Sequence, residues 1–159
     1  MKRNRRIICL IMLVCAVAMS ACMIKKEAAD YYFHADGVDV IPGVSGADVI
    51  GRLGEARFVQ SSPSCAFDGE ERIYHYTDFD VYTSYENGRE TVERVVITGN
   101  TVATERGIRV GDSLYDVVRS YGRDYEKKGE NIEYDGEQCD MQFFFKDGIV
   151  TSIRYLADD

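Results

Sequence analysis

The chain has 159 residues, with 27 acidic against 19 basic side chains and a formal net charge of −8. That excess of negative charge repels phosphate backbones and anionic lipid head groups, which argues against nucleic acid as a partner. A chain of this length is expected to form a single domain.

The first residues have the three parts of a secretory signal. Residues 2–6 contain four basic side chains, residues 7–19 are an unbroken run of thirteen apolar and small residues, and two small residues precede Cys22. Thirteen residues are too few for a helix that spans a bilayer, which needs roughly 20. We therefore expect residues 1–21 to be a signal peptide that is removed. The alternative is an uncleaved signal anchor that continues through Ile24.

Residues 19–22, Met-Ser-Ala-Cys, resemble the lipobox of bacterial lipoproteins. The resemblance implies that Cys22 carries diacylglycerol and that the chain is extracytoplasmic and anchored to the cell membrane, or to the outer membrane if the host has one. We expect residues 22–39 to be the lipidated cysteine and a flexible tether.

Two cysteines, Cys65 and Cys139, remain in the part of the chain that is expected to fold. An even pair in an exported chain is compatible with one disulfide, which we expect here. The alternative is a pair of buried thiols, which pack as small apolar residues.

An internal repeat is the main organising feature of the sequence. Residues 43–54 (GVSGADVIGRLG) and 111–122 (GDSLYDVVRSYG) share the pattern G-x-S-x-x-D-V-(I/V)-x-x-(L/Y)-G. Each segment predicts a helix of about two turns that ends at its last glycine, in a left-handed conformation. The helix-capping residues are expected to be the N-cap serines and the aspartates three residues later, namely Ser45, Asp48, Ser113 and Asp116.

The residues after each predicted helix alternate as half-buried strands do, with Met141, Phe143 and Phe145 on one side of a strand. Asn87-Gly88 and Asp147-Gly148 predict tight hairpins, because both dipeptides tolerate positive φ. The repeat therefore predicts an α+β fold made of two tandem α-β-β-β units, with six antiparallel strands and both helices packed on one face.

The domain organisation follows from this repeat. We expect a first unit over residues 40–97, a connector over 98–110 and a second unit over 111–156. Neither unit would bury much core alone, so residues 40–156 are expected to form one globular domain.

The tandem pattern resembles the β-lactamase-inhibitor-protein-like architecture, and residues 107–117 (GIRVGDSLYDV) are similar to the opening helix of SmpA/OmlA-type envelope lipoproteins. The resemblance implies this fold and a role in binding proteins. The shared motif consists of caps and core positions, so it implies no binding residue.

Catalytic patterns are weak. Residues 43–47 approach a G-x-S-x-G nucleophile elbow, but alanine stands at the last position. Asp78 and Asp80 could form a carboxylate pair, although a turn before a strand explains both. We expect no enzyme activity and no cofactor.

Metal-binding patterns are equally weak. His34 and His75 are the only histidines, and no His-x-x-His or Cys-x-x-Cys spacing occurs. A cation held by His34, Asp36 and Asp39 is the alternative to a solvated acidic tether. We expect no metal site.

Aromatic residues on the predicted strands give the functional prediction. Tyr74, Tyr76, Tyr82 and Phe144 are expected to point away from the helices and to form an amphipathic surface, which is typical of protein interfaces. Ordinary β-propensity is the alternative explanation. We expect a membrane-anchored, non-enzymatic module that binds an envelope or extracellular protein. The alternative function is a lipoprotein that binds a small ligand or a cell-wall fragment.

Overall fold

The computed structural model describes residues 31–65 and 68–157. The predicted signal peptide and Cys22 lie outside this part of the chain. The elements are β1 (Phe33–Ala35), β2 (Val38–Val40), α2 (Gly46–Leu53), β3 (Phe58–Pro63), β4 (Glu70–His75), β5 (Phe79–Glu86), β6 (Arg89–Ile97), α3 (Leu114–Tyr121), β7 (Glu126–Lys128), β8 (Asn131–Tyr134), β9 (Cys139–Lys146) and β10 (Ile149–Ala157). Within the described ranges, no helix is both long and apolar enough to cross a membrane.

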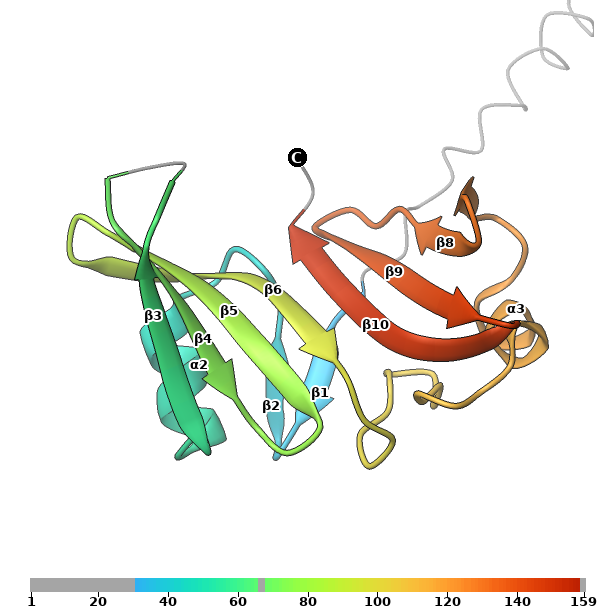
Figure 1. Ribbon diagram of the computed structural model, residues 1–159, viewed down its shortest axis with the longest axis horizontal. Coiled ribbons are helices and arrows are strands. Elements are labelled where there is room, and N and C mark those ends of the chain that lie inside the picture. Colours follow the sequence, from blue (N-terminus) through green and yellow to red (C-terminus); the bar gives the residue numbers. More distant parts are fainter. Residues whose placement is uncertain (1–30, 66–67, 158–159) are drawn as a thin grey trace, which may run out of the picture.

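Most of the molecule is one antiparallel sheet of eight strands in the order β3-β4-β5-β6-β10-β9-β8-β7. Four strands follow each helix, and the sheet is continuous because β6 pairs with β10 in its middle (Figure 1). Strands β1 and β2 pair separately. The fold is therefore α+β, with a mostly antiparallel sheet and, in the described ranges, two short helices.

The prediction of six strands missed β3 and β7, which are the two edges of the large sheet. Every residue of both strands is exposed. A strand with neither face buried shows no alternation of apolar and polar residues, so hydrophobic patterning could not reveal it. Pro63 at the end of β3 is in keeping with an edge position.

The core lies on one face of the sheet. A row of residues that oppose one another across β5, β6, β10 and β9 supplies Val81, Val95, Tyr155 and Met141, each fully buried. Helix α2, helix α3 and the β1–β2 hairpin all cover this face, behind the sheet in Figure 1. The opposite face, here called the open face, is covered by none of the described elements.

The prediction of a flexible tether up to residue 39 is wrong for its last part. Strands β1 and β2 form a hairpin on the core face, with Phe33 and Val40 fully buried. The hairpin turns at Asp36 and Gly37, which have φ of 50° and 76°. An Asp-Gly pair between alternating apolar residues is a hairpin signal. The acidic composition of the segment led to the prediction of a tether instead.

The two helices begin at similar caps of unequal quality. Ser113 and Asp116 form a full capping box, in which the Ser113 Oγ accepts from the Asp116 N–H at 3.2 Å and the carboxylate accepts from the Ser113 N–H at 3.3 Å. At the start of α2, the Ser45 Oγ accepts from the Asp48 N–H at 3.5 Å, a long hydrogen bond. The start of α3 is the better satisfied of the two.

Both helices end at glycine, but the glycines do not adopt the left-handed helical conformation that was predicted. Gly54 has φ 81° and ψ −164°, and Gly122 has φ 91° and ψ −171°. This combination of positive φ and extended ψ is open essentially to glycine alone. It directs the chain away from each helix axis into the following loop.

The predicted disulfide does not form, since Cys65 and Cys139 are not joined to each other. Cys65 is exposed just beyond β3, whereas Cys139 is buried at the start of β9, five strand positions away in the sheet. Strands are spaced by about 4.8 Å, so the separation is roughly 24 Å. A disulfide needs Cα atoms within about 7 Å.

Candidate functional site

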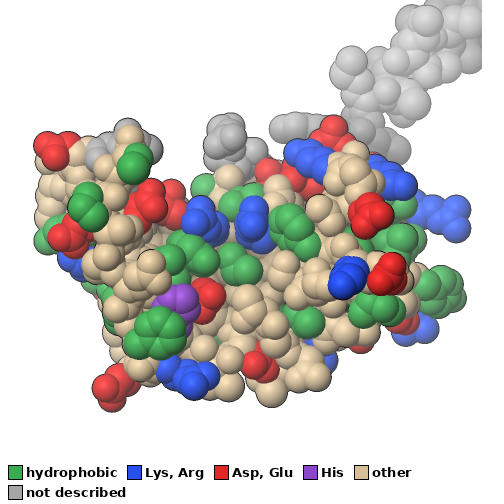
Figure 2. All heavy atoms as spheres, in the orientation of Figure 1, with side chains coloured by type: hydrophobic (Ala, Val, Ile, Leu, Met, Phe, Trp, Pro, Cys, Tyr) green, Lys and Arg blue, Asp and Glu red, His purple; other side chains and the backbone are tan. Residues whose placement is uncertain are grey.

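The open face carries charged and aromatic side chains in place of an apolar layer. The strand register places two neighbouring rows of residues there, Phe58, His75, Asp80, Val96, Arg154, Gln142 and Glu133 in one row, and Gln60, Ile73, Tyr82, Arg94, Leu156 and Asp140 in the other. Figure 2 shows basic side chains near the middle of this face, with hydrophobic side chains on both sides of them.

Two arginines in the middle of the open face lie over aromatic rings. The Cζ atom of Arg94 lies 4.0 Å from the centre of the Tyr82 ring, and the Cζ atom of Arg154 lies 4.7 Å from the centre of the Phe144 ring. Contacts of this kind combine ring–cation attraction with stacking of the planar guanidinium. All four side chains are half-buried.

A histidine–carboxylate pair stands beside them. The Nδ1 atom of His75 lies 2.7 Å from the Asp80 carboxylate, and the Phe58 ring stacks on the imidazole with centres 4.1 Å apart. The Nε2 atom is shielded and has no hydrogen-bond partner among the described residues. Asp80 therefore orients the ring, and Phe58 covers it.

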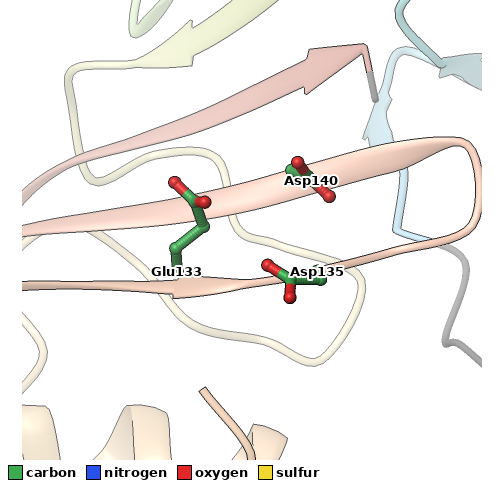
Figure 3. A group of neighbouring side chains, drawn as sticks. All are labelled: Glu133, Asp135 and Asp140. Carbon is green, nitrogen blue, oxygen red and sulfur yellow. The ribbon is translucent and has the colours of Figure 1, made fainter. Parts of the chain in front are cut away.

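Three carboxylates gather near the other end of the open face (Figure 3). Ligand atoms of Glu133, Asp135 and Asp140 lie within 4.8 Å of one another. The buried Glu133 carboxylate already accepts from the Lys128 ammonium at 2.5 Å and from the Gln142 amide. These protein donors account for the buried charge of Glu133, so the cluster alone does not indicate a metal site.

The four aromatic residues predicted to share a face do not all share it. Tyr82 and Phe144 are on the open face, whereas Tyr74 pairs with the buried Val81 and points toward the helices. Its hydroxyl donates to a Glu90 carboxylate oxygen at 2.8 Å. Because successive strand residues alternate between faces, the register alone decides this, and the sequence did not reveal the register.

Tyr76 is also on the core side. Its ring stacks on Phe79 with centres 4.7 Å apart, and its hydroxyl donates to the Gly54 carbonyl at 3.3 Å. Both Tyr74 and Tyr76 therefore belong to the packing beneath α2, and the predicted surface is reduced to Tyr82 and Phe144.

Sequence reasoning missed Arg94 and Arg154. Arg154 stands between apolar residues of its strand, in Ile153-Arg154-Tyr155, whereas Arg94 follows Glu93 and precedes Val95. A long cation at the outward position of a central strand was the available signal, because such a strand has one face free to carry it.

The other residues considered for chemistry are separated. The Asp78 carboxylate accepts from the Thr101 N–H at 2.7 Å, and hydrogen bonds from Thr101 lower the pKa of Asp78. Asp80 instead contacts His75, so the two carboxylates do not act as a pair. The Nδ1 atom of His34 lies 2.6 Å from the Asp39 carboxylate, a hydrogen bond across the β1–β2 hairpin. Neither residue belongs to the carboxylate cluster of Figure 3.

A hollow of about 610 Å³ lies between the β1–β2 turn and the connector. Glu105 contributes to it and also accepts hydrogen bonds from the Tyr121 and Tyr155 hydroxyls, at 3.0 and 3.2 Å. Burial raises the pKa of the Glu105 carboxyl, and burial likewise raises the pKa of both tyrosines, which keeps their hydroxyls protonated as donors.

No protein-family model and no curated protein matches the chain. Three solved structures are similar to it. An extracellular protein containing an SCP domain from Bacillus anthracis matches with a TM-score of 0.54 and 17% identity, over 86% of this chain and 50% of that chain. A DUF4309 family protein (YjgB) from Bacillus subtilis matches with a TM-score of 0.45 and 17% identity, over 75% and 82% of the two chains.

The third structure, the uncharacterized protein yfeY from Escherichia coli, has a TM-score of 0.45 and 13% identity, over 82% of this chain and 97% of its own. This chain spans about half the length of the Bacillus anthracis protein. At 17% identity that match shows a shared fold and carries no activity across.

Proposed function

We propose that this chain is an extracytoplasmic lipoprotein, anchored through Cys22, whose open face binds another envelope or extracellular protein without catalysis. The observation that carries the proposal is the uncovered centre of the sheet, where Tyr82 and Phe144 lie beneath two arginines. Aromatic residues and arginine are the side chains most enriched where proteins bind each other.

The proposal includes a repeated architecture. The two halves of the fold are copies of one unit, each a capped helix followed by four antiparallel strands, and not three as the sequence predicted. Support comes from the shared twelve-residue pattern and from the equal length of α2 and α3. The likeness to the β-lactamase-inhibitor-protein-like architecture is part of this proposal.

Proximity labelling in the native host tests it, with the labelling enzyme fused after Asp159. One envelope protein should be labelled strongly by the natural chain and only weakly by Tyr82→Ala and Phe144→Ala variants. The matched control is Tyr115→Ala, which removes a tyrosine that is 72% exposed on α3, on the other side of the sheet. Labelling that follows general membrane abundance, or that is lost equally in the control, contradicts the proposal.

A Cys22→Ser variant tests the anchor separately. We expect it to be released from membranes and to lose the specific labelling. Retention of the variant in the membrane fraction would argue for the uncleaved signal anchor.

Binding of a small ligand or a cell-wall fragment is the second candidate function, favoured by the hollow beside the β1–β2 turn. It predicts a higher melting temperature in the presence of muropeptides, and a His34→Ala or Thr101→Ala change should reduce that shift. An open-face change such as Tyr82→Ala should leave it unaltered.

A further inference from the structure

The two open-face arginines stand at the junction where the two halves of the sheet meet. Arg94 on β6 opposes Leu156, and Arg154 on β10 opposes Val96, so the two arginines are diagonal neighbours on one face. Diagonal neighbours of this kind have Cα atoms roughly 7–8 Å apart. The fold therefore brings two like charges together at a junction that neither half contains alone.

Neither guanidinium forms an ion pair with a described residue, although the strand register places Asp80 diagonal to Arg94 and Asp140 diagonal to Arg154. Among the described residues, no carboxylate oxygen lies within 4.0 Å of either guanidinium, although the chain as a whole carries a net charge of −8. Burial lowers the pKa of Arg154, and the neighbouring charge of Arg94 lowers it further. Two adjacent cations that form no ion pair repel each other, so an anion in contact with both would be stabilised.

The geometry leaves donors available for such an anion. The Cζ atom of each guanidinium lies over a ring, and the N–H groups of an arginine can bond a carboxylate in pairs. The Nε atom of Arg154 is shielded and has no hydrogen-bond partner among the described residues. A shielded donor without an acceptor is destabilising, and an acceptor from another molecule would remove that cost.

There is room beside Arg154. A hollow of about 150 Å³ is lined by Arg154, Phe144, Gln142, Lys128 and Glu133 among others, and the Glu133 carboxylate in it already accepts from Lys128 and Gln142. A space of this size exceeds the roughly 30 Å³ share of one water molecule several-fold, so it admits a carboxylate with a short apolar stem. The Phe144 ring offers the apolar wall that such a stem would contact.

We propose that Arg94 and Arg154 together bind a carboxylate on an acidic segment of the partner protein, with Tyr82 and Phe144 in contact with its aliphatic stem. The inference rests on the proposed function for the source of the carboxylate. A singly charged carboxylate is favoured over a doubly charged phosphate, because the carboxylates of Glu133 and Asp140 stand on the same face and repel a dianion more strongly.

Calorimetric titration of the full chain in a non-ionic detergent tests the assignment, with a terminally blocked hexaglutamate peptide as the probe. The matched hexaglutamine peptide and inorganic phosphate are the comparison probes. We expect Arg94→Gln and Arg154→Gln each to weaken hexaglutamate binding about 10-fold or more, because each removes a charged hydrogen-bonding partner. The hexaglutamate affinity of Arg154→Lys should lie between those of the natural chain and Arg154→Gln, since lysine keeps the charge and loses the paired donors.

Arg119→Gln is the control for charge, because it removes an exposed arginine from α3 on the other side of the sheet. The inference is overturned if this control weakens binding as much as the open-face changes, if hexaglutamine binds equally well, or if phosphate binds more tightly than hexaglutamate. Should a glutamine variant fail to fold, the ¹⁵N shift of the Arg154 Nε in the natural chain supplies the readout. It should move with hexaglutamate and not with hexaglutamine.

Failure of this inference is distinguishable from failure of the proposed function. If Tyr82→Ala abolishes partner labelling but the arginine variants bind hexaglutamate normally, the result supports the proposed function and contradicts the carboxylate site. If hexaglutamate binding depends on both arginines but partner labelling does not depend on the open face, the result supports the carboxylate site and contradicts the proposed function.

Discussion

The half of the sheet formed by β3–β6 and the half formed by β7–β10 follow helices with the same sequence pattern, yet they bury different amounts of side chain. In β8, three of four residues are buried, whereas no residue of β4 is. Tyr134 is 1% exposed and donates to the Gly122 carbonyl at 2.8 Å, while Tyr76 is half-buried and reaches the Gly54 carbonyl at 3.3 Å. Each helix C-terminus thus receives a tyrosine hydroxyl, but only one of the two tyrosines is enclosed.

One matching position of the two helices differs in the side chain that it supplies to the core. Tyr121 ends α3 and contacts the Tyr134 and Phe143 rings, with centres 5.3 and 5.4 Å apart, whereas Leu53 occupies that place in α2. Aromatic clusters bury more apolar area than a leucine does and favour edge-on contacts. The comparison teaches that helices with the same sequence pattern can precede strands that bury different amounts of side chain.

The largest expected effect is on the enclosed tyrosine. Tyr134→Ala should lower the free energy of unfolding by about 3–5 kcal/mol, the range for large aromatic truncations in cores, and Tyr76→Ala should cost roughly half of that. Urea unfolding at neutral pH measures both. Equal losses of stability would show that the two tyrosines are equally well packed and would contradict the difference between the two halves.

A smaller effect is expected at Gly46, which stands where the second segment has Leu114. A Cβ atom at Gly46 would lie 2.7 Å from the Glu90 Cγ and 3.3 Å from the Glu90 backbone carbon. We expect Gly46→Ala to destabilise by about 1–3 kcal/mol through overpacking.

Gly51 in the same helix is the matched control for this change, because nothing lies within 4 Å of an added Cβ there. Gly51→Ala should stabilise the chain by about 0.5–1 kcal/mol through helix propensity. A stabilising Gly46→Ala change in the same urea experiment would contradict the close approach of α2 to β6.

The helix caps should show a smaller difference again. Ser113→Ala removes a full capping box and should cost about 1–2 kcal/mol, whereas Ser45→Ala removes one long hydrogen bond and should cost about 0.5 kcal/mol. Ser→Thr at either position, which keeps a hydroxyl, serves as the control. A larger loss at Ser45 would reverse the ranking of the two helix starts.

The smallest expected effect depends on pH and concerns Glu105, whose hydrogen bonds go to Tyr121 and Tyr155 in the second half. Burial raises the pKa of Glu105 above its ordinary value of 4.5, so the folded chain holds this proton more tightly than the unfolded chain. The stability linked to that proton is fully present below pH 4.5 and is lost as the pH rises through the raised pKa.

Glu105→Gln removes this titration and keeps an oxygen that accepts from the tyrosines. As the pH rises from 4.5 to 7.5, the urea midpoint of the variant should therefore rise relative to that of the natural chain. Asp116, whose pKa is lowered by hydrogen bonds from Ser113, titrates below this pH range and does not contribute to the change in the midpoint difference. A difference between the two midpoints that stays constant with pH would show that Glu105 is charged throughout.

The sequence by itself determined the local features of this protein. Ser45 and Ser113 start the helices and Gly54 and Gly122 end them, because caps and chain reversals depend on a few adjacent residues. The hairpin turns are equally local, with Asn87 at φ 52° and Asp147 at φ 53°, each followed by a glycine with positive φ.

Only the tertiary structure decided which residues share a surface. A shift of one residue in strand register exchanges the two faces of a strand, and this placed Tyr74 in the packing and Tyr82 on the open face. The edge strands, the burial of Phe33 and the distance between the two cysteines likewise depend on long-range pairing. The same is true of Arg94 and Arg154, which are 60 residues apart in the chain and become neighbours because β6 pairs with β10.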